Sequence, residues 1–340
     1  DFLAAEMADT GKPHAMASTI DVPRGIANFR MFADILATAP LDSHRLDLPD
    51  GAYALNYAAR KPLGVVGVIS PWNLPLLLMT WKVAPALACG NAVVVKPSED
   101  TPGSATLLAE VMEAAGVPPG VFNLVHGFGP DSAGEFISRH PDISAITFTG
   151  ESRTGTTIMR AAAEGVKPVS FELGGKNAAI IFADCDFEKM LDTMMRALFL
   201  NSGQVCLCSE RVYVERPLYE RFCEALVARI KAMKIDWPND PGTQMGPLIS
   251  ASQRDQVLTM IAGALEQGAT LLAGGTVPEQ FENGFWLRPT LLGNVTAQMR
   301  IAREEVFGPV ITVERFIGEA QALQLANDTP YGLAAGVWTQ

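Results

Sequence analysis

The chain has 340 residues, of which 48% are hydrophobic and 19% are charged, and its formal net charge is −11 at pH 7. This length gives room for two domains, and the composition is that of a compact globular protein. The acidic charge argues against nucleic acid or an anionic membrane as a partner, because either would require a basic face. The five cysteines and four histidines are scattered, which predicts no disulfide framework, no metal site and a reducing cytoplasm.

The two ends of the chain and its most apolar run indicate what kind of segment this is. No signal peptide is visible at the N-terminus. The run 74–89 is interrupted by Pro75, Lys82 and Pro85 and is too short to span a bilayer, so we expect a buried helix there. The chain begins inside a helical pattern and stops at Gln340 just after a strand-like stretch, which indicates a piece of a longer protein.

The first predicted element is a helix over residues 21–39, with Asp21 as its cap and Pro23 in its first turn. Its expected apolar stripe comprises Val22, Ile26, Phe29, Ala33 and Leu36. Arg24 lies off this stripe, in a first turn where a cation opposes the helix dipole. We therefore expect either a solvated arginine or a residue that binds an anionic ligand.

Residues 44–62 show no helical stripe and predict an extended, hairpin-like arm around Asp50-Gly51. From residue 65 onward, strand and helix patterns alternate, which predicts a parallel, doubly wound sheet with helices on both faces. Its expected strands are 65–70, 92–96, 121–125, 145–149 and 169–172, and its expected helices are 74–88, 104–115, 132–139 and 153–164.

A second alternating series begins after Gly174-Gly175, so this double glycine is the predicted domain boundary. Strands are expected at 178–182 and 211–215, helices at 187–200 and 218–233, and further elements at 257–266, 270–273, 310–316 and 320–327. The fold class is therefore α/β.

Polar residues follow several strands of the first series, at the edge of the sheet where an open α/β fold binds its ligand. Lys96 and Glu99 follow the second strand and could hold the hydroxyls of a ribose, which favours NAD over NADP; an exposed ion pair is the alternative. The third strand is followed by Gly127, Gly129 and Gly134, a run that departs from the Rossmann pattern. Thr149-Gly150-Glu151 opens a helix whose N-terminus could meet a phosphate.

Three residues suggest chemistry at the same edge. Cys206 lies in FLNSGQVCLCS, a polar turn between a helix and a strand, and is either a nucleophile or a structural cysteine, whereas Cys208 is taken as structural. Glu172, between Phe171 and Leu173, is either a surface residue at a strand end or a general base in an apolar pocket. Asn73 offers a neutral amide donor for an oxyanion.

The motifs PWN, KPSE, FTG, ELGGK, GQVC and EEVFGP occur in that order along the chain. This combination resembles the NAD(P)-dependent aldehyde dehydrogenase superfamily from about Thr10 to Gln340. The resemblance implies a Rossmann-like NAD-binding domain (1–43 and 63–173), an oligomerisation arm (44–62) and an α/β catalytic domain (174–340). It also implies a homodimer or homotetramer, and that the family's first strands and C-terminal portion lie outside this chain.

The resemblance assigns the catalytic roles to three residues. Cys206 corresponds to the nucleophile that forms a thiohemiacetal and then a thioester with the aldehyde. The amide of Asn73 and the backbone N–H of Cys206 correspond to the oxyanion donors. Glu172 corresponds to the base that activates water for hydrolysis of the thioester.

The resemblance likewise assigns the NAD site. Lys96 and Glu99 match the ligands of the adenosine ribose, with Gly129 at the next strand end, and Glu305 matches the ligand of the nicotinamide ribose. Phe307 is expected near the nicotinamide, and Trp72 and Gly150 near the pyrophosphate. Glu151 departs from the family pattern, because many members carry Ser there and a carboxylate repels pyrophosphate.

The stretches PRGIANFRMFAD, GVISPWNLPLLLMTWKVAPALACGN and FTGESRTG are most similar to those of the bacterial 2-hydroxymuconic and 2-aminomuconic 6-semialdehyde dehydrogenases of aromatic-compound catabolism. Their substrates carry a carboxylate opposite the aldehyde, and Arg24 becomes its candidate anchor. The alternatives are another small aldehyde, a catalytically silent relative, or a nitrilase-like cysteine hydrolase built on Glu172, Lys176 and Cys206. Retention of Cys206, Glu172 and Asn73 argues against a silent relative.

Overall fold

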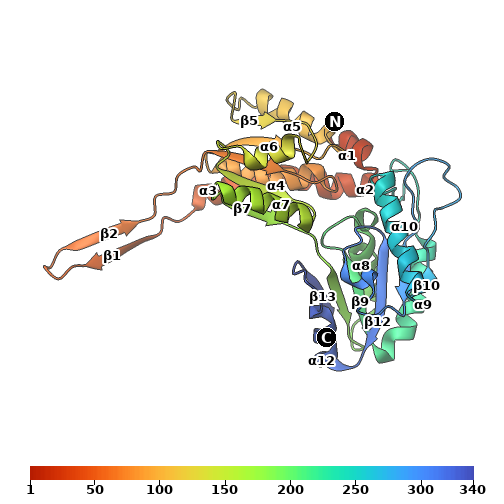
Figure 1. The fold of residues 1–340 in the computed structure, drawn as a ribbon. Coiled ribbons are helices and arrows are strands. Elements are labelled where there is room, and N and C mark those ends of the chain that lie inside the picture. Colours follow the sequence, from red (N-terminus) through yellow and green to blue (C-terminus); the bar gives the residue numbers. More distant parts are fainter.

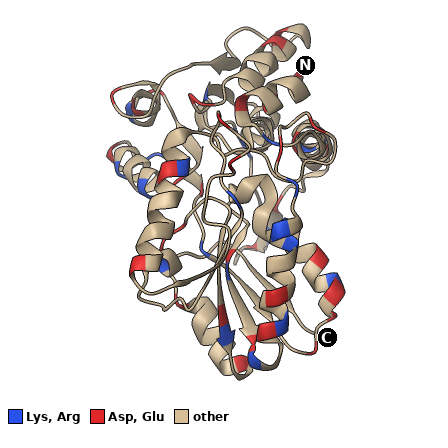
Figure 2. Ribbon diagram, turned by 90° about the vertical axis from the view of Figure 1, so that its right-hand side faces the viewer, with Lys and Arg blue, Asp and Glu red and all other residues tan.

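The computed structural model describes residues 1–340, which form two sheets and a protruding arm (Figure 1). The N-terminal helices lead into the arm, the arm leads into the first sheet, and the second sheet follows. Acidic and basic residues are interspersed over the helices (Figure 2). No helix combines the length and the apolar character that crossing a bilayer requires.

The first sheet has five strands in the order β5-β4-β3-β6-β7, and every neighbouring pair is parallel. Its strands are β3 (Val65–Ile69), β4 (Ala92–Lys96), β5 (Phe122–Leu124), β6 (Ala145–Thr149) and β7 (Val169–Glu172). Its helices are α4 (Pro75–Ala88), α5 (Gly103–Ala114), α6 (Ala133–Arg139) and α7 (Ser152–Glu164). The predicted parallel sheet is confirmed.

Alternating side chains of these strands build two cores, one on each face of the sheet. Val66 and Val68 of β3 pack with α4 and α5, whereas Ile146 and Phe148 of β6 pack with α6 and α7. Both faces are therefore covered, which explains why the strands read as almost continuous apolar runs.

The second sheet has six strands in the order β10-β11-β12-β9-β8-β13, parallel except for the antiparallel pair β10–β11. Its strands are β8 (Asn177–Ile181), β9 (Ser209–Glu215), β10 (Thr270–Ala273), β11 (Thr290–Gly293), β12 (Val310–Phe316) and β13 (Ala335–Trp338). Its helices are α8 (Phe187–Phe199), α9 (Tyr219–Ala232), α10 (Ala251–Glu266), α11 (Arg300–Arg303) and α12 (Gly318–Asn327). The sequence patterns did not predict β11 or α11.

Gly174-Gly175 lies between β7, at the edge of the first sheet, and β8 in the second. The assignment of the two halves as functional domains stays a prediction.

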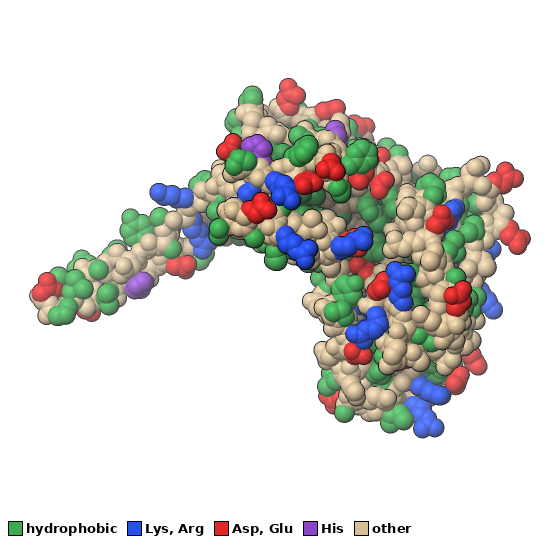
Figure 3. Space-filling model, in the orientation of Figure 1, with side chains coloured by type: hydrophobic (Ala, Val, Ile, Leu, Met, Phe, Trp, Pro, Cys, Tyr) green, Lys and Arg blue, Asp and Glu red, His purple; other side chains and the backbone are tan.

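The arm is an antiparallel hairpin of β1 (Ser43–Asp47) and β2 (Tyr53–Tyr57), as predicted around Asp50-Gly51. Its turn contains Gly51 at a φ of 82°. Its strands carry exposed apolar side chains, and Figure 3 shows hydrophobic groups along its length. An apolar hairpin in solvent is typical of a surface that another chain covers.

Four helical segments precede the arm: α1 (Phe2–Thr10), α2 (His14–Met16), the π-helical η1 (Ala17–Asp21) and α3 (Val22–Thr38). The prediction that Asp21 caps α3 is wrong, because helical backbone continues through it and its side chain is buried against Lys12. The predicted apolar stripe is also partly wrong, since Ile26 and Leu36 are exposed. Ala33 is exposed as well.

The face of α3 that packs on α4 is built differently from that stripe. Gly25 allows a close approach, because a Cβ there would lie 2.9 Å from Leu76. Asn28 is buried and donates to the carbonyl of Leu77 and to the hydroxyl of Thr80. A small residue and a hydrogen-bonded amide therefore form the contact, and neither belongs to an apolar periodicity.

Candidate active site

The strand order places the predicted site residues along one edge of the first sheet. Because the strands are parallel, their carboxyl ends meet there. Lys96 and Glu172 are the last residues of β4 and β7, and Gly129, Asn73 and Gly150 follow β5, β3 and β6. The strands that follow β3 in the chain (β4 and β5) lie on one side of it, and β6 and β7 lie on the other side. A crevice therefore opens between the ends of β3 and β6.

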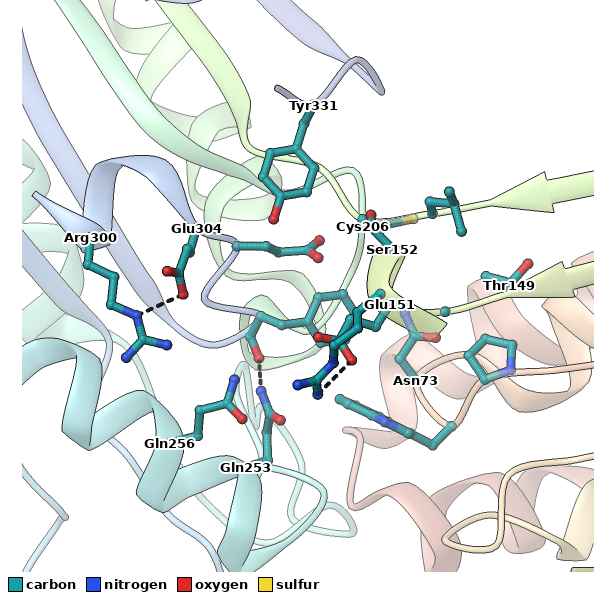
Figure 4. Close-up of a pocket in the computed structure, with 18 residues that line it drawn as sticks. Asn73, Thr149, Glu151, Ser152, Cys206, Gln253, Gln256, Arg300, Glu304 and Tyr331 are labelled. Carbon is teal, nitrogen blue, oxygen red and sulfur yellow. Dashed lines mark hydrogen bonds and ion pairs between the residues drawn. The ribbon is translucent and has the colours of Figure 1, made fainter. Parts of the chain in front are cut away.

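A cavity of about 640 Å³ lies at this crevice, between the two sheets (Figure 4). Of the predicted residues, those that line it are Trp72, Asn73, Gly150, Cys206, Glu305 and Phe307. Those that do not line it are Arg24, Lys96, Glu99, Gly129 and Glu172. The cavity thus joins residues from distant parts of the chain, and the predicted set divides into an inner and an outer group.

The loop before Cys206 has an unusual backbone. Asn201, Ser202 and Gly203 are all left-handed, with φ values of 52°, 58° and 73°. Gly203 also packs so closely on the carbonyl of Gly308 that a Cβ would collide with it. Left-handed backbone costs a non-glycine residue roughly 1–2 kcal/mol. The Asn-Ser-Gly sequence is therefore explained by a strained turn that carries the chain from α8 to the cavity.

The backbone around Cys206 is fixed by Asn177, the first residue of β8. Its amide donates to the carbonyls of Cys206 (2.6 Å) and Cys208 (3.0 Å), and its Oδ1 accepts from the N–H of Ala334 (3.0 Å). Sequence patterns gave no sign of this role, because the contact joins residues 29 positions apart.

Burial raises the pKa of the Cys206 thiol to about 11, and the nearby carboxylates of Glu305 and Glu172 act in the same direction. The thiol is therefore protonated at neutral pH in this arrangement. A thiolate would form there through proton removal or through a cation placed beside the sulfur.

Asn73 is bonded to the Cys206 loop at two points. Its Nδ2 donates to the carbonyl of Gln204 at 2.9 Å, and its own carbonyl accepts from Asn201 Nδ2 at 3.1 Å. Its Oδ1 is buried without a hydrogen-bond partner. The amide is thus held at the cavity beside the loop that carries the thiol, and its role as an oxyanion donor stays a prediction.

Glu172 is exposed at the end of β7, so the apolar pocket considered for it is absent from this structure. The physical reason is the strand order, because β7 forms the edge of the first sheet. The Glu172 carboxylate still raises the pKa of Cys206. Burial lowers the pKa of Lys82 to about 8, and the Glu172 carboxylate opposes that shift. Lys82 Nζ donates to Thr147 at 3.1 Å.

Glu305 approaches the double glycine of ELGGK from the second sheet. Its Oε1 accepts from the N–H of Gly175 at 3.0 Å, and a Cβ on Gly174 would collide with its other oxygen. Burial raises the pKa of Glu305 to about 7. Glycine at position 174 therefore leaves room for this carboxylate in its present position.

The turn that carries Glu305 is held by a buried carboxylate. Glu210 accepts from the N–H groups of Val306 and Phe307 and forms a buried ion pair with Lys176. Phe307 has a φ of 54° and packs edge-on to Trp72, with ring centroids 5.2 Å apart. This aromatic pair spans the cavity from one half of the chain to the other.

Apart from Arg24, the outer group lies at or near the carboxyl ends of strands of the first sheet. Lys96 is buried and its Nζ contacts Glu99 at 3.1 Å and the carbonyl of Pro97 at 2.8 Å, so the two residues form an ion pair whose lysine is shielded from solvent, and their role toward a ribose stays a prediction. A Cβ on Gly129 would meet open space, so packing does not require glycine there. Glycine at 150, by contrast, is required, since a Cβ would lie 2.5 Å from the ring of Phe148.

Two ion pairs line the cavity mouth. Glu151 contacts Arg153 at 3.3 Å, so a neighbouring cation offsets the carboxylate that departs from the family pattern. Arg300 contacts Glu304 at 2.7 Å. Sequence reasoning also missed other lining residues, among them Gln253, Gln256 and Tyr331.

Arg24 lies apart from this cavity, on the exposed surface of α3. Its guanidinium lies 5.9 Å from the ring centroid of Trp81 on α4 and forms no ion pair. Trp81 is 41% exposed. The structure therefore places a free cation and an aromatic ring together, outside the space around Cys206.

The comparison with known proteins decides the family. The model of the aldehyde dehydrogenase family matches residues 1–340, the whole chain. The chain belongs to the aldehyde dehydrogenase family. As a member it is an oxidoreductase that acts on aldehydes, and its fold class is the one predicted.

Among curated relatives, a 2-aminomuconic 6-semialdehyde dehydrogenase of Pseudomonas sp is 76% identical over 342 residues. A 2-hydroxymuconic semialdehyde dehydrogenase of Pseudomonas sp. (strain CF600) is 56% identical over 343 residues. These alignments cover 100% of the chain but 70% and 71% of the two aldehyde dehydrogenases.

Solved aldehyde dehydrogenases share the fold. A betaine aldehyde dehydrogenase from Staphylococcus aureus in complex with NAD+ superposes with a TM-score of 0.95 at 39% identity, covering 100% of this chain and 66% of that one. The NAD+ complex of an aldehyde dehydrogenase from Bacillus cereus gives 0.95 at 40% identity, covering 100% and 68%.

Membership of the aldehyde dehydrogenase family also removes the nitrilase-like alternative. That interpretation required Lys176 beside Cys206 and Glu172. Lys176 is instead fully buried in its ion pair with Glu210 and does not line the cavity. The lysine of that alternative lies just before β8, and its partner Glu210 holds the turn before β12.

Proposed function

We propose that the protein oxidises a carboxylate-bearing semialdehyde, 2-aminomuconic or 2-hydroxymuconic 6-semialdehyde, to the dicarboxylic acid with NAD. The observation that carries this proposal is the convergence of Cys206, Asn73 and Glu305 on one cavity at the crevice of the first sheet. The 76% identity to a 2-aminomuconic 6-semialdehyde dehydrogenase supports the substrate class.

The residues around the cavity fit the nicotinamide end of a dinucleotide. The hydroxyl of Thr149 is buried at the cavity without a partner, and Glu305 presents a carboxylate suited to ribose hydroxyls. Trp72 and Phe307 provide aromatic edges. Lys96 and Glu99 would bind the adenosine ribose one strand away, and Gly129 would leave room beside it. When bound, NAD supplies the hydride acceptor for the oxidation.

The chain's own residues then perform the remaining chemistry. Cys206, once deprotonated, forms a bond from its sulfur to the aldehyde carbon, and the carbonyl electron pair moves onto oxygen. The amide of Asn73 and the N–H of Cys206 donate to this oxyanion. After oxidation the acyl group is a thioester of Cys206. Glu172 takes a proton from water, which attacks the thioester, and the carbon–sulfur bond breaks to release the acid.

Arg24 is the proposed anchor for the distal carboxylate. Its guanidinium is exposed, has no competing ion pair, and lies beside Trp81 on α4, whose N-terminus immediately follows Asn73. A long acyl chain that reaches Cys206 past α4 would bring its far end toward α3. The planar guanidinium suits a carboxylate.

The deciding experiment is a screen of NADH release by the full-length enzyme with acidic, neutral and cationic aldehydes of similar length. The proposal predicts the highest kcat/KM with the acidic semialdehydes. Equal values across the three charge classes would remove the substrate assignment but leave the aldehyde dehydrogenase activity in place. A separate comparison of the two muconic semialdehydes would then rank amino against hydroxy.

The proposal includes a cytoplasmic homodimer or homotetramer. Its support is the apolar arm, whose exposed residues include Leu46, Leu55 and Tyr57, together with five cysteines that are all free. Light scattering on the full-length enzyme tests the assembly, since a monodisperse monomer would contradict it.

A further inference from the structure

Lys12 is a lysine that is almost completely shielded from solvent. It is 1% exposed, in the loop between α1 and α2, and its ammonium has three acceptors around it. These are Glu6 Oε2 at 3.1 Å, the carboxylate of Asp21, and the carbonyl oxygen of Asn73 at 3.1 Å. All three protons of the ammonium are therefore used, and one of them goes to the backbone of the proposed oxyanion donor.

Glu6 extends the same cluster to α4. Its second oxygen, Oε1, accepts from the N–H of Leu76 at 2.9 Å. Leu76 lies in the first turn of α4, where N–H groups lack intrahelical partners, and Leu74 at the cap position supplies no side-chain acceptor. A carboxylate from α1 thus substitutes for the missing cap and also suits the helix dipole.

The two contacts hold both ends of the turn 73–76. Lys12 binds the carbonyl at its start and Glu6 binds the N–H at its end. From the other side, Asn201 donates to the same carbonyl of Asn73. Both lone pairs of that oxygen are thereby occupied, one by the N-terminal cluster and one by the loop that leads to Cys206.

Stability alone is a poor reason for such a cluster. Two carboxylates and one ammonium lie out of water, and the Oδ1 of Asp21 has no partner. Buried ion groups of this kind are often no more stable than apolar residues of the same volume. Burial raises the pKa of Asp21 to about 6, which shows that its charge is held at a cost. The hydrogen bonds of the cluster, by contrast, are directed at one backbone segment, the turn 73–76.

We propose that Glu6, Lys12 and Asp21 act as positioning residues that hold the side-chain amide of Asn73 in register with Cys206. The cluster does not touch the cavity and acts through Asn73. This inference rests on the proposed role of Asn73 as oxyanion donor. If it holds, substitution of the three residues lowers kcat when the Asn73 amide is present and has little effect when that amide has been removed.

A double-mutant cycle tests this on the full-length enzyme. Lys12→Met alone would leave two carboxylates unpaired, so the variant used is the triple Glu6→Gln/Lys12→Met/Asp21→Asn. It is neutral, keeps an acceptor for Leu76 and removes the bond to Asn73. We expect kcat to fall about 10-fold with KM for the aldehyde and the Kd of NAD unchanged. Asn73→Ala should lower kcat by about 100-fold.

In the Asn73→Ala background, the triple substitution should change kcat by less than about 2-fold, because no amide remains to be positioned. A full 10-fold loss in both backgrounds would overturn the proposal, and so would an unchanged kcat of the folded triple variant. If the triple variant does not fold, Glu6→Gln alone serves the same cycle, with an expected loss of about 3-fold confined to the Asn73 background.

Asn28→Leu is the matched control. It removes a buried polar group from the neighbouring α3–α4 contact, where the amide of Asn28 binds Leu77 and Thr80 but not Asn73. It should lower the melting temperature and leave kcat unchanged. Failure of the proposed function has a separate signature, since Asn73→Ala itself would then keep wild-type kcat.

Discussion

Asn73 Nδ2 donates to the carbonyl oxygen of Gln204 at 2.9 Å, across 131 positions of sequence. The bond joins the end of β3 to the strained loop before Cys206. It also fixes which groups share the cavity, because the amide and the thiol then belong to one rigid junction between the two halves of the chain.

Cys206→Ala should abolish NADH formation with a muconic semialdehyde and leave NAD binding intact. The thiol supplies the atom that bonds to the substrate, whereas the proposed dinucleotide contacts come from Trp72, Glu305 and Phe307. Steady-state NADH absorbance and a fluorescence titration with NAD measure the two properties. Residual turnover above about 1% of wild type would show that another residue attacks the aldehyde.

Glu172→Ala should slow deacylation and leave acylation largely intact. The carboxylate is exposed at the edge of the first sheet, where water is available to it. We expect kcat to fall by about 100-fold and the acyl-enzyme to accumulate, visible by mass spectrometry as an adduct on Cys206. The Glu172→Gln variant controls for shape. Wild-type turnover by Glu172→Ala would transfer the role of base to another group.

Much of this arrangement follows from the sequence, and some of it does not. The strands of the first sheet and the turn at Asp50-Gly51 were predictable, because short apolar runs that alternate with helix patterns, and turn residues, are local signals. The buried face of α3 was not predictable. Gly25 lets α3 approach α4 closely, and Asn28 forms hydrogen bonds with α4, and neither feature is an apolar periodicity. The six motifs indicated the family. The positions that tie them together, Asn177 and Glu210, act across long separations that no local pattern encodes.

Glu172 illustrates the limit for the site itself. Its neighbours Phe171 and Leu173 allowed either a pocket or a surface position, and the order of the sheet decides for the surface. Lys12 is the reverse case, a charged residue whose burial the sequence does not indicate. A lysine after a helix is ordinarily read as solvated, yet its partners at positions 6, 21 and 73 bury it completely.

Glu305→Gln should make Cys206 more reactive in the protein without NAD. Burial and the Glu305 carboxylate both raise the pKa of the thiol, to about 11, so the thiolate is scarce at pH 8. Removing one negative charge lowers that pKa, and each unit increases the thiolate fraction about 10-fold. We expect iodoacetamide to alkylate the variant about 3- to 10-fold faster at pH 8.

The wild-type alkylation rate should rise continuously from pH 6 to pH 9 without a plateau, since this range lies below the pKa of about 11. Peptide mapping against Cys206→Ala identifies the labelled cysteine. A slower reaction of Glu305→Gln would mean that Glu305 helps to form the thiolate, and the electrostatic explanation would be wrong.

Arg24→Ala should raise KM for acidic semialdehydes about 10- to 100-fold and change KM for neutral aldehydes by less than about 2-fold. The guanidinium forms no ion pair within the chain and acts only at a distance on the carboxylate of Asp21, so its loss removes the proposed contact with the substrate and little of the fold. Arg24→Lys is the matched control and should recover part of the effect, because it keeps the charge but not the planar pair of donors. Equal KM changes for acidic and neutral aldehydes would assign Arg24 to packing against Trp81. A selective effect would place the far carboxylate at α3 and orient the acyl chain along α4, with its reactive end between Asn73 and Cys206.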